Sequence, residues 1–316
     1  AELQTRMLRT ILRRLTEETQ PDGTPELQEL LRTLGVMTDL KPDGGPIESP
    51  VDEMDRTRAF LCKIMFDHGQ LNNLHFALKQ AGQIGSMVRD RISMDTWRIL
   101  DRFSQVLHEQ SCEDELTDIA DMLDDLIVPL SAFSGLGFES MTHGYAWRFM
   151  DMGFRLERAV MSAVVMRELL CSPEVYETPV LDAMLEIGSS SITYRTRYQS
   201  NVAILPLLDL LIADHTNPRS IAFQLELINE HIRELSHLPR LGQLTEQIQS
   251  EELVRFVEDF DLSMITGFDA HGNRPKLADF LQRVIDKVQE LSVLINERYL
   301  SHVQSTHKLS SLVGGK

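Results

Sequence analysis

The sequence lacks the features that mark secreted, disulfide-stabilised and membrane-spanning proteins. Its 316 residues contain three cysteines, Cys62, Cys112 and Cys171, without a CxxC pair, which favours reduced thiols over a disulfide framework. The longest apolar run, residues 202–213, is interrupted by a proline and an aspartate and is shorter than the roughly 20 residues of a bilayer-spanning helix. The opening residues show no charged segment followed by an apolar one. We therefore expect a cytoplasmic protein without a signal peptide or a membrane-spanning segment.

Basic residues are in deficit as well. The chain has 31 Lys and Arg against 48 Asp and Glu, a formal net charge of −17 at pH 7. A chain with this balance does not attract a phosphate backbone at long range, so we expect no nucleic-acid partner. Cationic ligands, or phosphate-bearing ligands held by local arginine clusters, remain compatible with it.

Motifs of common catalytic sites are also absent. There is no GxxxxGK phosphate loop, GxGxxG turn or GxSxG nucleophile elbow, so we expect no cofactor in this chain. A two-metal helical bundle needs Glu-x-x-His motifs on two helices and two further carboxylates. The sequence has one such motif, from Glu234 to His237. We therefore expect no metal site.

What the sequence does have is helical periodicity from end to end. No segment alternates polar and apolar residues at period two, and apolar residues recur three and four positions apart. This pattern predicts an all-α fold, a multi-helix bundle of about ten helices. A chain of this length can bury a substantial core. We interpret residues 1–316 as a single helical domain, with two repeated lobes, 1–110 and 111–316, as an alternative.

Capping and turn residues predict several helix boundaries. Thr24-Pro25 begins a short helix that Gly35 ends, and a helix from Ser49-Pro50 runs to about Phe66. Residues 114–133 form an acidic helix, and the helix after it continues to about Leu170. A further helix begins at Thr178-Pro179 and extends through Arg195, which falls in its apolar stripe.

The segment from Trp147 to Ala159 is the most informative part of the chain. At about 100° per residue, one helix would place Trp147, Met150, Phe154, Met161 and Val164 on a single stripe, with Glu157 in its middle. Polar residues at spacings of three and four form a neighbouring strip that comprises Arg148, Asp151, Arg155 and Arg158.

A carboxylate in an apolar stripe needs a partner, because desolvating an isolated ionised Glu costs several kcal/mol. Arg195 would lie in the apolar stripe of its own predicted helix, and an Arg–carboxylate pair can be bidentate. We therefore predict a buried pair between Glu157 and Arg195, with Tyr194, Arg197 and Tyr198 as alternative partners. Such a pair is either a structural ion pair or part of a functional polar cluster.

These residues resemble the signature of a known family. The run Trp147-Arg148-Phe149-x-Asp151-x-Gly153-x-Arg155-x-Glu157-Arg158-Ala159 is similar to the motif of the alpha-E domain, a bacterial all-helical domain named for its Glu-Arg pair. Further blocks agree in order and extend the resemblance over nearly the whole chain: Arg89-Asp90-Arg91-Ile92-Ser93 with Thr96-Trp97, Tyr194-Arg195-x-Arg197-Tyr198, Asn217-Pro218-Arg219-Ser220 and Arg298-Tyr299.

The resemblance carries implications of its own. A first copy of the Glu-Arg motif would precede Ala1, which implies that the chain is truncated at its N-terminus. Alpha-E domains occur beside or fused to circularly permuted ATP-grasp domains and near transglutaminase-like proteins. That association implies an ATP-grasp partner, which would itself hold ATP and Mg²⁺, in an amide or peptide ligase or peptide-modification system.

Three functions follow as hypotheses. The first is a non-catalytic domain that docks the ligase, or its peptide or acidic small-molecule substrate. The second is an enzyme that uses an Arg/Glu polar seam on an anionic substrate, and the third is a purely structural interaction module. A docking role predicts an exposed apolar patch, and an enzyme predicts a concave pocket reached by the seam. The seam residues are Arg89, Arg91, Arg148, Asp151, Arg155, Glu157, Arg158, Tyr194, Arg195, Arg197, Tyr198 and Arg219.

Overall fold

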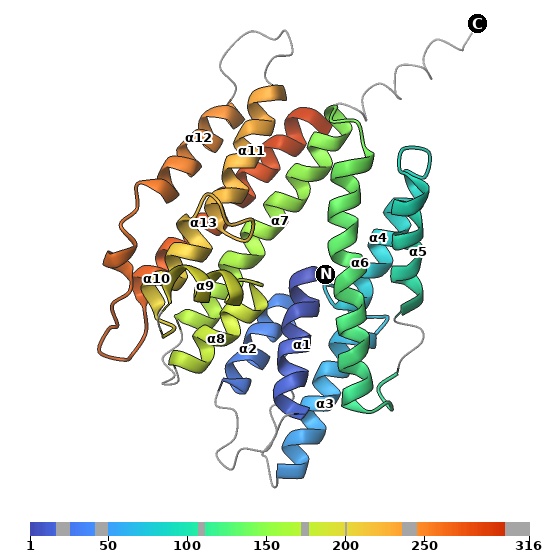
Figure 1. Cartoon of the computed structure of the whole chain (residues 1–316), viewed down its shortest axis with the longest axis vertical. Helices are drawn as coiled ribbons and strands as arrows, with labels where there is room; N and C mark the ends of the chain where they lie inside the picture. Colours follow the sequence, from blue (N-terminus) through green and yellow to red (C-terminus); the bar gives the residue numbers. More distant parts are fainter. Residues whose placement is uncertain are drawn as a thin grey trace, which may run out of the picture. The chain divides into compact units, whose positions relative to one another are not determined.

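The computed structural model of the chain describes residues 1–16, 26–41, 50–106, 111–171, 177–199, 201–235 and 245–300. Within these ranges every regular element is helical, with thirteen α-helices, one 3₁₀ helix and two π-helical segments (Figure 1). The all-α prediction is confirmed, and the number of helices is higher than the ten or so expected. Among the described helices, none combines the length and apolar character needed to cross a bilayer.

The helices form two compact units that interleave along the chain. One comprises Ala1–Trp147 and Glu168–Ala203, and the other comprises Arg148–Arg167 and Ile204–Lys316. The central part of α7 (Tyr145–Leu170) therefore belongs to the second unit and both of its ends to the first. The lobes suggested from the sequence divided the chain near residue 110 instead.

The first unit is built around α1. This helix packs against α2, α6 and α8, and Met7, Leu8, Ile11 and Leu12 are fully buried. Its arginines are paired with carboxylates: Arg9 and Arg13 contact Asp124, and Arg14 contacts Glu26 and Glu186. The helices of this unit are α1 (Glu2–Thr16), α2 (Leu27–Thr38), α3 (Pro50–Phe66), α4 (Leu74–Met87), α5 (Met94–Val106), α6 (Leu116–Ser140), α8 (Glu177–Ile187) and α9 (Ser191–Tyr198).

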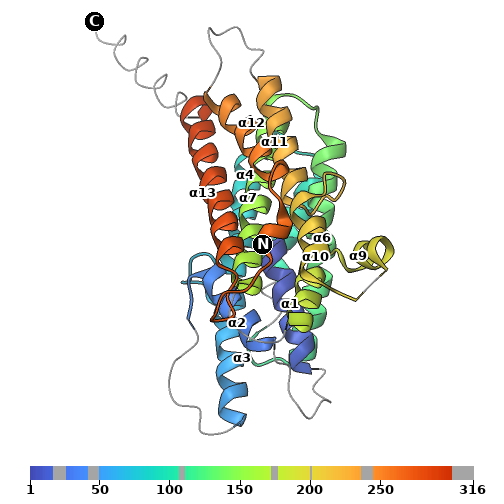
Figure 2. The same cartoon turned by 90° about the vertical axis from the view of Figure 1, so that its left-hand side faces the viewer.

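The second unit packs α11 against α12 and α12 against α13, and Figure 2 shows these three helices running alongside one another. Phe256, Phe260 and Phe280 form an aromatic cluster within it, with ring centroids 4.4–6.1 Å apart. Besides the central part of α7, its elements are α10 (Ile204–Leu208), η1 (Asp209–Ala213), α11 (Ile221–Leu235), α12 (Thr245–Glu258), η2 (Leu262–Ile265), α13 (Pro275–Ile295) and η3 (Asn296–Leu300).

Some predicted boundaries are confirmed and others are wrong. The helix ends predicted at Phe66 and Leu170 are confirmed. Gly35 does not end its helix, because α2 continues to Thr38 and turns at Asp39, whose φ is 56°. The acidic helix is longer than predicted, since α6 runs through Gly135 to Ser140. Thr24-Pro25 and His237 lie outside the described residues.

Candidate functional site

The buried face of α7 overlaps the predicted stripe at Trp147, whereas the other apolar members of that stripe, Met150, Phe154, Met161 and Val164, are half-buried. Met152, Ala159 and Ala163 are buried, whereas Glu157 is exposed. At about 100° per residue, Glu157 lies roughly 140° around the helix from these positions. The prediction of a buried Glu157 is therefore wrong. Glu157 is exposed to water, and a hydrated carboxylate needs no partner.

The predicted buried pair of Glu157 with Arg195 is also wrong, because both side chains are exposed. Arg195 does not belong to α8, the helix that begins at Glu177 and was predicted to extend through it. The backbone leaves α8 at Ile187, passes through Ser189 with a φ of 52°, and starts the separate helix α9 at Ser191. Because α8 and α9 are separate helices, the helical spacing counted along α8 does not predict the direction in which Arg195 points.

The polar strip of α7 flanks its buried face and meets α11. Asp151, 9% exposed, accepts hydrogen bonds from His231 Nε2 at 2.8 Å and from Arg155 Nε at 3.2 Å. Arg148 Nη1 lies 3.3 Å from His231 Nδ1, and Arg155 Nη1 donates to Gln224 Oε1 at 3.2 Å. We call Arg148, Asp151, Arg155, Gln224 and His231 the α7–α11 polar cluster.

The hydrogen-bond partners assign the protonation of the cluster. A guanidinium can only donate, so His231 Nδ1 must accept from Arg148, and the ring proton is then on Nε2, where it donates to Asp151. Burial by itself would raise the pKa of Asp151. The hydrogen bonds from His231 and Arg155, together with the positive charge of Arg155, outweigh that effect and hold the pKa below its ordinary value of 3.8. Asp151 is therefore ionised at neutral pH, and both ring nitrogens of His231 are occupied.

The Asn217-Pro218-Arg219-Ser220 block directly precedes α11 and supports this cluster. Asn217 Nδ2 donates to the carbonyl of Leu210 at 2.8 Å, and Ser220 Oγ accepts from the N–H of Phe223 at the start of the helix. Gln224 Nε2 donates to the carbonyl of Pro218 at 2.6 Å, which leaves its Oε1 for Arg155. The block thus fixes the entry to α11 and the orientation of Gln224.

A second buried carboxylate, Glu246 on α12, was not predicted from the sequence. It is 2% exposed, and its Oε1 accepts from Arg298 Nε at 2.7 Å and from the Tyr299 hydroxyl at 2.9 Å. Burial, together with the hydrogen bond to Glu246, raises the pKa of Tyr299 to about 12, so the phenol stays protonated and donates. The Arg298-Tyr299 block therefore anchors the C-terminal end of the described chain to α12.

The remaining predicted residues are distributed over both units. In the first unit, Tyr194 is fully buried, and its hydroxyl accepts from the N–H of Ala203 at 3.0 Å. Arg89 stacks over Trp97 at 4.8 Å. The others range from half-buried to exposed: Arg158, Tyr198 and Arg219 are half-buried, and Arg91, Arg195 and Arg197 are exposed. The structure thus brings together Arg148, Asp151 and Arg155 from the predicted seam.

Cysteine chemistry has no support at Cys62. Burial and the neighbouring thiol of Cys112 raise the pKa of Cys62 to about 12. Only the thiolate is a good nucleophile, so this thiol is unreactive at neutral pH.

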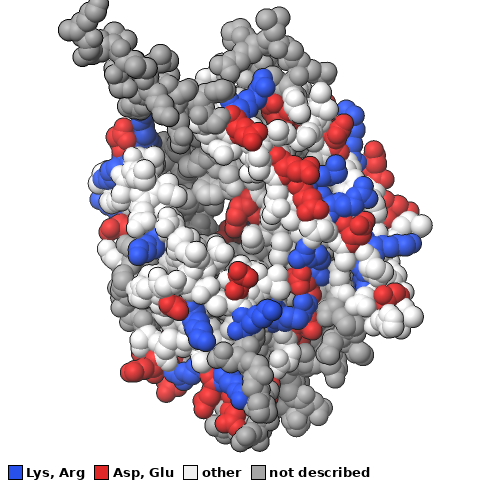
Figure 3. Space-filling model, turned by 180° about the vertical axis from the view of Figure 1, so that it is seen from behind, with Lys and Arg blue, Asp and Glu red and all other residues white. Residues whose placement is uncertain are grey.

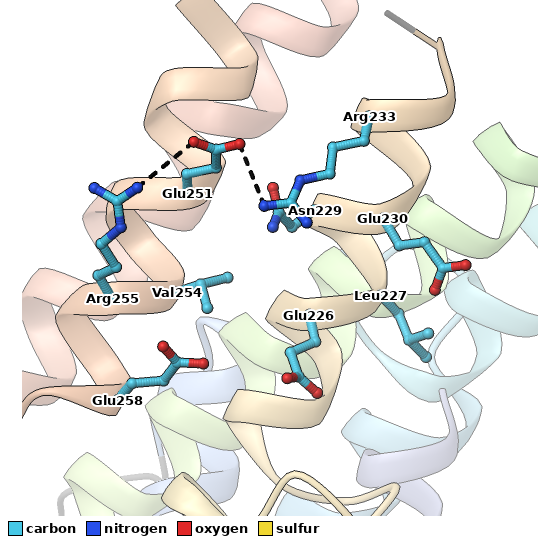
Figure 4. A pocket seen from close by; sticks show the side chains of 9 residues that line it. All are labelled: Glu226, Leu227, Asn229, Glu230, Arg233, Glu251, Val254, Arg255 and Glu258. Atoms are coloured by element: carbon cyan, nitrogen blue, oxygen red, sulfur yellow. Dashed lines mark hydrogen bonds and ion pairs between the residues drawn. The ribbon is translucent and has the colours of Figure 1, made fainter.

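A groove of about 520 Å³ lies between α11 and α12 (Figure 4). Arg233 and Arg255 both contact Glu251, at 3.3 and 3.7 Å, while Glu226 and Glu258 face the groove nearer its other end. No arginine of the predicted seam lines it. Its lining residues are Glu226, Leu227, Asn229, Glu230, Arg233, Glu251, Val254, Arg255 and Glu258.

Sequence reasoning missed this groove, although its signal is periodic. Charged residues recur at i, i+4 and i+7 on α11, at 226, 230 and 233, and on α12, at 251, 255 and 258. Each set is one helix face. The sequence could not indicate that the two faces meet. On the molecular face drawn in Figure 3, acidic and basic side chains are intermixed in the same way.

Comparisons with known proteins agree with the resemblance drawn from the motifs. A family model, Alpha-E, described as a predicted alpha-helical domain with a conserved ER motif, matches residues 1–300. Uncharacterized proteins of Mycobacterium tuberculosis, Rv2567, and Mycobacterium bovis, Mb2597, are each 25% identical over 215 residues. The matches cover 65% of this chain and 24% of those proteins, so the chain spans about a quarter of their length. No solved structure matches the chain significantly.

Proposed function

Because this chain belongs to the alpha-E domain family, we propose that it is a helical accessory domain that docks an ATP-grasp-type amide or peptide ligase. The family resemblance implies the partner, and the exposed apolar surface at the turn between α4 and α5 supports a docking role. ATP and Mg²⁺ would bind to the ligase, and this chain would present a surface to it.

The single observation that carries the proposal is a group of large apolar side chains in water. Ile84, Met87, Val88 and Met94 are 58%, 83%, 38% and 55% exposed within eleven residues of chain. We call these four residues the α4–α5 patch. Scattered exposed apolar residues are ordinary, but Ile84, Met87 and Val88 recur three and four positions apart at the end of α4 and so share one face, and grouped exposed apolar residues are typical of interaction sites. This is the feature that a docking role predicts.

The patch sits on a turn that the surrounding residues hold in place. Arg89 stacks over Trp97, and Gly85 lets α4 approach α5 so closely that a Cβ there would lie 2.5 Å from Leu100 Cδ1. The border is charged, with exposed pairs Arg91–Asp90 and Arg98–Asp95, each at 3.1 Å. An apolar centre with a charged rim is the usual anatomy of a protein interface.

The length of the relatives supports a partner that belongs to the same system. About three quarters of the mycobacterial proteins lies outside the matched segment. Those chains therefore have room for a further domain joined to the matched one. A ligase domain tethered in this way would meet a docking surface at high effective concentration.

The α7–α11 polar cluster gives less support to an enzyme acting alone. His231 has both ring nitrogens engaged and is 3% exposed, so no ring nitrogen faces a substrate. A general base must reach the proton that it removes. The cluster instead links α7 to α11 through hydrogen bonds, which is the role expected if the seam is purely structural.

The test is binding of the purified chain to a purified ATP-grasp-type ligase of the same organism, measured by calorimetry. Met87→Glu should weaken the affinity by about tenfold or more, because a charge would be desolvated at the centre of the interface. Ile192→Glu is the matched control, since Ile192 is also 83% exposed but lies on α9. Equal affinity for the wild type and Met87→Glu, or no binding by the wild type, would contradict the proposal.

A further inference from the structure

Three side chains from three segments of the second unit converge at one edge of the α11–α12 groove. His215 follows η1, Glu226 lies on α11, and Glu258 is the last residue of α12. His215 Nδ1 is 3.0 Å from Glu226 Oε1, and His215 Nε2 is 3.9 Å from Glu258 Oε1. One donor atom from each residue lies within 4.8 Å of the other two.

The backbone that presents His215 is firmly held. The carboxylate of Asp214 accepts from the N–H of Thr216 at 2.9 Å and from its hydroxyl at 2.7 Å. Ser220 Oγ donates to the Asp214 carbonyl at 2.5 Å, and Asn217 ties the same turn to Leu210. The imidazole is therefore attached to a fixed backbone beside the two carboxylates, which reduces the entropy lost when a ligand orders it.

The local charge favours a cation. Glu226 and Glu258 bring two negative charges to a site whose third member is an imidazole, and Glu230 adds another along the same face of α11. The two arginines of the groove, Arg233 and Arg255, are paired with Glu251. With neutral His215 the three donors carry a charge of about −2, which a divalent ion would neutralise.

The donor set also limits the choice of ion. One imidazole nitrogen with two carboxylate oxygens suits Zn²⁺, which takes His nitrogen and Glu oxygen at roughly 2.0–2.2 Å. Donors that far from one ion lie about 3–4 Å apart, so modest rotation of these exposed side chains would close the site. Mg²⁺ prefers an all-oxygen octahedral shell and fits this set less well.

We propose that His215, Glu226 and Glu258 bind a divalent zinc ion whose remaining coordination position is open to the α11–α12 groove. Glu226 and Glu258 both line that groove, so a carboxylate or phosphate oxygen of a bound ligand could complete the coordination. Catalytic zinc sites in proteins have this arrangement of three protein ligands and one open coordination position. The site uses different residues from the α4–α5 patch and does not depend on the docking proposal. It also departs from the expectation, drawn from sequence spacing, of no metal site.

The experiment is a titration of the purified chain with zinc. Binding is measured by calorimetry, and the thermal midpoint of unfolding is measured with and without zinc. The wild type should bind one equivalent with saturation, and its midpoint should rise with zinc. His215→Ala and Glu258→Gln should each weaken zinc affinity by about tenfold or more. Because both side chains are exposed, the metal-free midpoints should stay close to that of the wild type.

Two variants are matched controls. Glu230→Gln removes a carboxylate from the same groove without touching the three donors, and His271→Ala removes an exposed imidazole elsewhere in the second unit. Both should bind zinc as the wild type does. The proposal is overturned if the wild type shows no saturable zinc binding. It is equally overturned if His215→Ala and Glu258→Gln bind zinc with unchanged affinity, since the trio would then be only an ion pair.

Discussion

At the scale of single residues, Asp151 shows how an ionised carboxylate can be accommodated at a buried position. It has two donors, His231 and Arg155, and each of these has a further partner in Arg148 or Gln224. Every member of the α7–α11 polar cluster is therefore hydrogen-bonded. A satisfied polar network costs little to bury, whereas removal of one member leaves its neighbours with one hydrogen bond fewer in a desolvated site.

Replacing Asp151 should test this directly. Asp151→Ala would leave His231 and Arg155 without their shared acceptor and should lower the free energy of unfolding by about 3 kcal/mol, the low end for a broken buried pair. The measurement is urea denaturation at neutral pH. Glu157→Ala on the same helix is the control and should change stability by less than about 0.5 kcal/mol, because Glu157 is exposed. The reverse ranking of the two variants would refute this account of α7.

At the scale of elements, two glycines in helices, Gly35 in α2 and Gly153 in α7, have different surroundings. A Cβ on Gly35 would meet the carbonyl oxygen of Leu40 at 2.5 Å, because the chain turns back over the end of α2 at Asp39. A Cβ on Gly153, in the exposed middle of α7, would have no neighbour within 4 Å. The first glycine is required by the turn, and the second has only the entropic cost of glycine in a helix.

Alanine at these two positions should therefore have opposite effects on stability. Gly153→Ala should raise the free energy of unfolding by about 0.5–1 kcal/mol through helix propensity. Gly35→Ala should lower it by about 1–3 kcal/mol, because backbone atoms must move to relieve the clash. Thermal and urea denaturation of the two variants would check this. Stabilisation by Gly35→Ala would mean that the turn after α2 differs from the one described.

At the scale of the whole molecule, the chain carries a net charge of −17, and several of its arginines each pair with carboxylates of other helices. Arg9 and Arg13 share Asp124, and Arg14 lies between Glu26 and Glu186. Asp124 resembles Asp151 in one respect. Burial would raise the pKa of its carboxyl, but hydrogen bonds from Arg13 and Arg9 hold it below its ordinary value of 3.8.

These lowered pKa values predict how stability responds to acid. A carboxyl with a lower pKa in the folded state stabilises the protein fully above its ordinary pKa of 3.8 and loses that effect as pH falls toward the folded-state pKa. Unfolding free energy measured by urea denaturation should therefore fall steeply below about pH 4. Asp151→Asn should show a shallower fall than the wild type. An identical slope in both would exclude Asp151 as a source of the acid sensitivity.

The sequence by itself determined the fold class, the family and the extent of several helices. Helical periodicity, proline at a helix start and the motif around Glu157 are local properties, readable over a few residues. The helices ending at Phe66 and Leu170 follow from them. The polar strip of α7 was likewise visible as a spacing of three and four.

Only the tertiary structure decided which face of α7 is buried and which charges meet. Asp151 and His231 are 80 residues apart, and His215 and Glu258 reach the same groove edge from different elements. Periodicity ranks the faces of a helix by apolar content, but burial depends on what packs against each face. The buried positions of α7 include Ala159 and Ala163, whereas Glu157 is exposed, so the local apolar pattern alone did not indicate which face is covered.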